Sequence, residues 1–502
     1  MLRYAPAMLW GRRRTRSTAL TATTLTAVLL LTGCSAHVNA GSAGAEKAER
    51  ELSALDGVQS VRGSGTNNLP FAGEVSVRVT ADDDLSDADL RRVTHEVGRW
   101  IHDASGPGTT YHGSMEADGF GFFLEGRASE NDELLSVVDR LRGDDRWLGG
   151  DVDAPSASGT GGGRIALTAR DADDLVSAWD AVRGAASSIP GWDTASTTAS
   201  WSADQPDDLP SYQTPDLRIA NDVAGTDDTV GDPTPEIAAY ERVRAAHEVT
   251  RASVTPGRLL MHLADLDDVR DATAIAQQAA PDAQVIVDGG IVTKDEPQGD
   301  DDLPDADDYA EADRLAAVAV RPGVTAVSLT PTLVDVTVAD PDAVLATATA
   351  LAAAAPAAPV TSIRVGPKAD TTNGADGADR DAADDTNRLS VDGSPAMLSA
   401  SIQIGTALRA FLPASSEQFS TNQSVAATLS DAGQVPAFVA AVRPVLPEGS
   451  GLHVRLADRG TGGTTDLTLH DGQLTAEPLR DGEERGADRT DLERALLDAW
   501  NS

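Results

Sequence analysis

A duplicated segment constrains the fold of this chain more than any other sequence feature. Asp132–Gly143 and Asp173–Gly184 start 41 residues apart (173 − 132), and six of their twelve positions are identical. Each copy follows a run typical of a strand, at 120–126 and at 165–169. Each copy starts with acidic residues and ends in Arg-Gly, an order that suits the helix dipole and a glycine after the last turn. The duplication therefore predicts two copies of one strand–helix unit.

The same order of elements recurs elsewhere in the chain. Val75–Val79 alternates strictly between apolar and polar residues, which predicts a half-buried strand. A helix is expected from Ser86 or Asp87 to about His102, because its apolar residues recur at three- and four-residue spacing. An equivalent strand is predicted far downstream at Val334–Val338. It is followed by an acidic turn that opens another helix.

Further strand–helix units are predicted at 258–279 and 424–442, with a C-terminal helix at Thr490–Trp500. Their spacing is irregular, so we do not expect a solenoid with a short fixed period. The sequence instead predicts an α+β fold of tandem split-βαβ-like sandwiches, in which antiparallel sheets carry helices on one face. The Gly-Val-x-x-Val elements at 57–61 and 323–327 resemble those of small envelope modules of the BON type, which implies the same fold class.

Composition shifts divide the chain into predicted regions. Proline and aspartate gather at 205–233, and 366–390 is acidic with almost no apolar residue, as in disordered segments. The predicted order is a signal peptide at 1–33, a tether at 34–45, α+β repeat domains at 46–204 and 234–365, linkers at 205–233 and 366–390, and a C-terminal α+β domain at 391–502.

The N-terminus carries a basic segment, then a short apolar run, then Leu31-Thr32-Gly33-Cys34. The apolar run, 19–31, is shorter than the ~20 residues of a spanning helix. This pattern resembles the signal peptide and lipobox of bacterial lipoproteins. The bias toward Ala, Asp, Arg, Thr and Gly suggests an actinobacterial source.

The resemblance to lipoproteins implies cleavage between Gly33 and Cys34. It also implies a diacylglycerol on the sulfur of Cys34 and an acyl chain on its new amine. The protein would then be held by lipid on the extracytoplasmic face of the cytoplasmic membrane. The pair Arg13-Arg14 leaves twin-arginine export open beside the general secretory route.

Charge and cysteine content exclude several classes of function. The formal net charge is −39, so the chain lacks the basic footprint that nucleic-acid binding requires. Cys34 is the sole cysteine, so a lipidated chain has neither disulfides nor a catalytic thiol. We therefore expect no nucleic-acid partner. The membrane, reached through lipid, and an unknown envelope protein are the expected partners.

The sequence offers no motif of a known catalytic or metal site. Two His-Glu pairs start at His95 and His247, but arginine stands where a zinc protease needs its second histidine. Zinc held by His95, His102 and His112 is a minor alternative, as is weak calcium binding by the acidic stretches at 300–308 and 376–387. No catalytic residue, metal ligand or cofactor is predicted.

The expected function is that of a lipid-anchored, non-catalytic scaffold or binding protein of the cell envelope. Two alternatives stay open. One is a ligand- or lipid-binding lipoprotein, which needs a cavity. The other is a hydrolase whose acidic and histidine residues converge only in the folded chain.

Overall fold

The computed structural model describes residues 40–502 except 70–71, 84, 155–162, 193, 205–214, 223–229, 296–303, 355–359, 361, 368–387, 420–421, 458–463 and 477–486. The chain divides into two compact units, with the boundary between Pro215 and Asp216. Each unit is described by itself below. The predicted linker 366–390 and the signal peptide lie largely or wholly outside the described residues.

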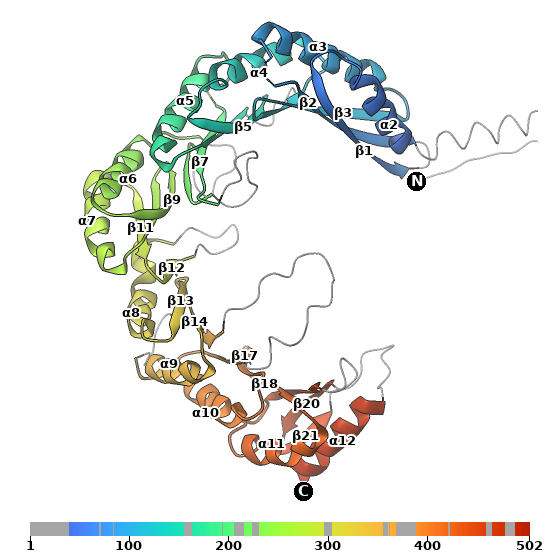
Figure 1. Ribbon diagram of the computed structural model, residues 1–502. Helices are drawn as coiled ribbons and strands as arrows, with labels where there is room; N and C mark the ends of the chain where they lie inside the picture. The colour runs from blue at the N-terminus through green and yellow to red at the C-terminus, as the bar shows by residue number, and fades with distance from the viewer. Residues whose placement is uncertain are drawn as a thin grey trace, which may run out of the picture. The chain divides into compact units, whose positions relative to one another are not determined.

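Unit 1 alternates helices with β-hairpins (Figure 1). Its elements are α2 (Ala40–Leu52), β1 (Val58–Leu69), β2 (Ala72–Ala81), α3 (Asp87–Ala104), β3 (Thr109–Ala117), β4 (Phe120–Leu124), α4 (Ala128–Leu141), β5 (Trp147–Asp153), β6 (Arg164–Ala169), the 3-10 turn η1 (Ala172–Asp174), α5 (Leu175–Ser187) and β7 (Ser196–Trp201).

Unit 2 continues the same alternation. Its first half contains β8 (Leu217–Ala220), α6 (Thr234–Ala246), β9 (Val249–Thr255), β10 (Arg258–Leu263), η2 (Leu266–Asp268), α7 (Val269–Ala279), β11 (Gln284–Gly289), β12 (Val292–Lys294), η3 (Ala306–Tyr309), α8 (Ala310–Ala319), β13 (Val324–Leu329) and β14 (Leu333–Val338). Its second half contains α9 (Pro341–Ala354), β15 (Ser362–Gly366), β16 (Leu389–Gly393), α10 (Leu398–Leu408), β17 (Ala414–Phe419), β18 (Asn422–Leu429), η4 (Ala432–Gln434), α11 (Val435–Val442), β19 (Gly451–Leu456), β20 (Thr464–His470), β21 (Gln473–Ala476) and α12 (Ala487–Asn501).

Each unit has one mixed sheet in which every strand pairs with the next strand along the chain. Hairpin partners such as β1 and β2 are antiparallel, and strands joined by a helix, such as β2 and β3, are parallel. A helix between two strands carries the chain back to the end of the sheet where the first strand began, so the next strand runs in the same direction. The successive hairpins of a unit therefore belong to one continuous sheet.

The helices of each unit lie on one face of its sheet (Figure 1). Strand residues that point to this face are apolar and buried, as Val75, Val77 and Val79 are on β2. Helix residues at three- and four-residue spacing meet them, including Leu90, Val93 and others on α3. The opposite face of each sheet, here called the open face, carries the alternating polar side chains.

The predicted α+β class, with helices on one face, is confirmed. The parallel pairs between modules were not anticipated. Helix α3 begins at Asp87 as predicted, because the Ser86 hydroxyl accepts a hydrogen bond from the Asp89 amide and caps the first turn. The duplicated segments form most of α4 and α5, each after a hairpin strand, β4 or β6.

The predicted tether 34–45 is partly wrong. Helix α2 begins at Ala40, inside the segment predicted as a tether, and it packs against β1 and β2. The contact is close because both sides lack bulk. A Cβ on Gly65 would lie 2.2 Å from the carbonyl carbon of Gly41, and one on Gly41 would lie 2.5 Å from the Thr66 oxygen. Residues 34–39 lie outside the described residues.

Candidate functional site: a hollow on the open face of unit 1

Basic and acidic side chains face each other across neighbouring strands of the open face in unit 2. His262 on β10 is in register with Asp288 on β11, and their Nδ1 and Oδ1 atoms are 2.6 Å apart. Arg364 on β15 is in register with both Asp335 on β14 and Asp392 on β16. Such cross-strand pairs stabilise a sheet, whereas like charges at the same positions destabilise it.

Arg364 makes 3.3 Å and 3.5 Å contacts with Asp392 and Asp335. The pKa of Asp335 is nevertheless raised, because burial of its carboxyl group outweighs the favourable charge of Arg364. Nearby Asp392 and Asp295 raise it further. Asp153 on β5 shows the same balance in unit 1. Burial raises its pKa despite the charge of Arg164, its register partner on β6.

A hollow of about 320 Å³ opens on the open face of unit 1, over β1 to β4. Alternation along these strands places polar side chains in it, while every second residue faces the helices. The side chains of Arg62, Ser64, Ser76, Arg78, His112, Ser114 and Phe123 line the hollow.

Two arginines oppose each other in this hollow. Arg62 on β1 is in register with Arg78 on β2, and both side chains are exposed. Neither has an ion-pair partner among the described residues. Three serines surround them, since Ser64 is in register with Ser76, and Arg78 with Ser114. The hollow is therefore rich in hydrogen-bond donors and carries two positive charges that the described part of the protein leaves unpaired.

An aromatic ring and a histidine complete the hollow. Phe123 on β4 is in register with Ser114 and is 60% exposed, unlike its buried neighbours Phe122 and Leu124. His112 on β3 lies 3.5 Å from Glu74 on β2. The hollow thus combines cationic and hydroxyl groups with an exposed apolar surface.

The open face of unit 2 holds a histidine–carboxylate pair of the kind that orients a catalytic base. His262 and Asp288 are largely buried, and Asp288 also accepts a hydrogen bond from the Lys294 amide. In the described chain, no hydroxyl group hydrogen-bonds the remaining nitrogen of His262.

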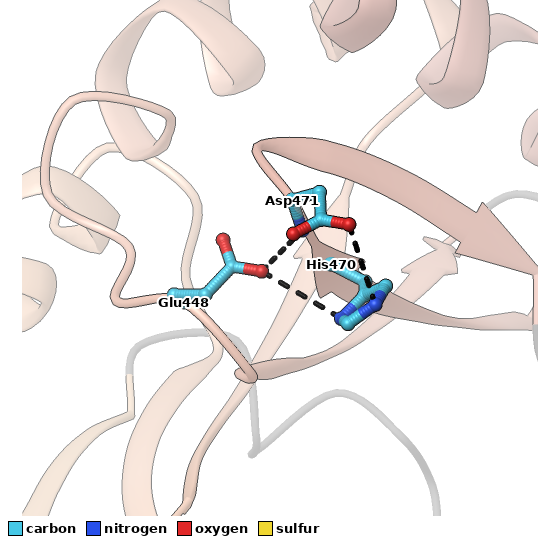
Figure 2. Close-up of side chains that lie close together, drawn as sticks. All are labelled: Glu448, His470 and Asp471. Atoms are coloured by element: carbon cyan, nitrogen blue, oxygen red, sulfur yellow. Dashed lines mark hydrogen bonds and ion pairs between the residues drawn. The ribbon is translucent and has the colours of Figure 1, made fainter.

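One further cluster lies where β20 turns into β21. Figure 2 shows Glu448, His470 and Asp471, whose ligand atoms lie within 4.8 Å of one another. The Glu448 carboxylate already accepts hydrogen bonds from the amides of Asp471 and Gly472, the latter at 3.1 Å. It thereby caps a turn in which Asp471 has a φ of 50°. All three side chains are exposed. The hydrogen bonds of Glu448 assign the cluster a role in stabilising the turn.

The histidines considered for zinc do not converge. His95 lies on α3, where its Nε2 is 3.0 Å from Asp132 of α4. His112 lies on the open face, on the other side of the sheet, and His102 lies near Gly126 at the end of α3. Cys34 and Gly33, the predicted sites of lipidation and cleavage, and the acidic stretch 376–387 lie outside the described residues.

Sequence reasoning missed the hollow. The alternation around Arg78 is visible in the sequence, but the opposition of Arg62 and Arg78 depends on the register between β1 and β2. The hairpin between them offers one weak signal, since residues 62–78 include two arginines and a single acid, Glu74, in a strongly acidic chain.

No family model, no curated protein and no solved structure matches this chain. Across the described ranges, no helix has both the length and the hydropathy that crossing a bilayer requires.

Proposed function

We propose that this chain is a lipid-anchored, extracytoplasmic binding protein that has no catalytic role and uses the open face of unit 1 to hold its ligand. The observation that carries the proposal is the hollow over β1 to β4, with its opposed Arg62 and Arg78. Arrays of repeated modules present extended surfaces of this kind to binding partners. The Leu31-to-Cys34 segment supports the anchor, because it resembles a lipobox.

Crosslinking in intact cells tests the binding role. A photoreactive residue replaces Ser76, which lines the hollow, or Glu133, an exposed residue of α4 on the helix-covered side. The proposal expects a discrete adduct, seen by mass spectrometry, from the Ser76 position and not from the Glu133 position. Adding Arg62→Gln and Arg78→Gln should abolish the Ser76 adduct. Equal labelling at both positions, or none at either, contradicts the proposal.

Enzyme activity is the competing possibility, and it has its own test. Removing the histidine–carboxylate pair with His262→Gln should leave cellular function and the Ser76 adduct unchanged if the protein is not catalytic. Loss of a measured turnover on this substitution, with the fold intact by circular dichroism, would instead assign a hydrolase. This outcome is distinguishable from a failure of binding, because His262 does not line the hollow.

A further inference from the structure

We infer that the hollow binds a phosphate group carrying about two negative charges, on a ligand whose ring or apolar portion rests on Phe123. This inference rests on the proposed function and names the class of ligand. The site has an energetic cost. Arg62 and Arg78 face each other in register on neighbouring strands, where like charges destabilise a sheet.

The composition of the chain makes this opposition informative. The protein has 79 acidic residues against 40 lysines and arginines. On the open face of unit 2, two basic residues, Arg364 and His262, have a carboxylate in register. Arg62 and Arg78 have none, and the acidic residues on β2 and β3, Glu74 and Glu116, are in register with other residues. Glu74 already contacts His112, and Glu116 is in register with Thr80. An anion from outside the described chain is the complement that this site lacks.

The donor set favours phosphate over a single carboxylate. A guanidinium group presents a planar fork of donors that matches carboxylate and phosphate oxygens. One carboxylate satisfies one fork and neutralises one charge, whereas a phosphate monoester offers three oxygens and close to two charges. Hydroxyl groups of Ser64, Ser76 and Ser114 line the same hollow and can donate to the remaining oxygens.

Phe123 indicates that the ligand is larger than inorganic phosphate. Its ring is 60% exposed, and Phe123 and Val320 are the large apolar side chains exposed in the described ranges. Phe123 borders the hollow beside Ser114, so it lies next to the cationic groups. An aromatic face beside a phosphate site suits a ring or acyl portion of the ligand, which covers it on binding.

Calorimetric titration of the purified full-length chain tests the inference with defined probes. Phenyl phosphate carries both the phosphate and a ring, inorganic phosphate lacks the ring, and benzoate has a ring with one charge. Phenyl phosphate should bind tightest and should bind more weakly at higher salt, because the site is solvent-exposed. Equal binding of benzoate would contradict the choice of a phosphate.

Substitutions distinguish binding in the hollow from a general effect of positive charge on the protein surface. Arg62→Gln with Arg78→Gln should weaken phenyl phosphate binding by about tenfold or more, since each lost contact is charge-assisted. Arg164→Gln removes the same charge from another strand of the same open face and should change it less than about twofold. Phe123→Ala should bring phenyl phosphate down to the affinity of inorganic phosphate. Circular dichroism melts confirm that each variant is folded.

A separate experiment tests whether the phosphate belongs to a lipid headgroup or to a soluble ester. Full-length Cys34→Ala chain is sedimented with phosphatidylcholine vesicles that contain or lack phosphatidic acid. Retention on phosphatidic acid alone, lost in the double arginine variant, assigns a lipid headgroup, and binding of phenyl phosphate alone assigns a soluble ester. No binding of any probe, or binding unchanged in the double variant, overturns the inference. A Ser76 adduct in cells with no phosphate binding overturns this inference and leaves the proposed function standing.

Discussion

At the scale of single residues, the opposed arginines predict a conflict between stability and binding. Arg62→Gln removes one of two like charges in register, so it should raise the free energy of unfolding by about 0.2–1 kcal/mol without ligand. Denaturant unfolding measures this change, which should shrink at high salt. Arg164→Gln is the control, because it removes a charge that faces Asp153. A loss of stability in Arg62→Gln would show that the arginine has a stabilising partner.

Glu236 predicts a pH dependence of stability. It is 5% exposed on α6, where Oε1 accepts a hydrogen bond from Gly257, and burial raises its pKa above 4.5. The folded chain therefore holds this proton more tightly than the unfolded chain does. Its stabilising contribution is full below pH 4.5 and is lost as the pH rises through the folded pKa.

Glu236→Gln removes this titration. The stability of the variant relative to the parent should rise with pH across that window, by about 1.4 kcal/mol per unit of pKa difference. Urea unfolding at a series of pH values between 4 and 8 measures the difference. A constant gap between parent and variant would show that Glu236 titrates normally.

At the scale of elements, the close contact between α2 and the first hairpin predicts sensitivity to small additions. Gly65→Ala places a methyl group against the backbone of Gly41, so α2 must shift. We expect a loss of about 1–3 kcal/mol, typical of overpacking. Hydrogen exchange should quicken in α2 first. Gly106→Ala is the matched control, because a Cβ there meets no atom within 4 Å. Equal effects of the two substitutions would mean that the α2 contact is loose.

Elements were predictable where a pattern is local. The Val334–Val338 alternation gave β14 within one residue, and Asp87 gave the start of α3, because side-chain period and capping chemistry act over a few residues. The regular order of hairpins and helices was not recognisable in the sequence, because the segments that connect the strands differ in length. Examples are the segments between β5 and β6 and between β15 and β16. The first turns of helix α2 were predicted as part of a tether, because its glycines resemble a linker until the strand that they pack against is known.

At the scale of the whole molecule, the candidate site could not be found from the sequence. The hollow joins residues from four strands, and its charge opposition exists only in one register of β1 and β2. A sequence motif consists of residues at a short, fixed spacing. The residues of the hollow are far apart in the sequence and have no such spacing. The pairs His262–Asp288 and Arg364–Asp392 were equally invisible, because the partners are 26 and 28 residues apart.

The proposed anchor brings the folded chain close to the membrane. Helix α2 begins at Ala40, so only the segment 35–39 separates it from Cys34, and fully extended it spans about 20 Å. An acidic protein gains nothing from the electrostatic attraction of anionic lipids, so its attachment should depend on the acyl chains. Cys34→Ala should therefore release the chain from washed membranes and abolish incorporation of labelled palmitate. Cys34→Ser separates loss of the thiol from a change in size and should behave identically. Membrane attachment that survives both substitutions, without label, would instead indicate an uncleaved N-terminal segment as the anchor.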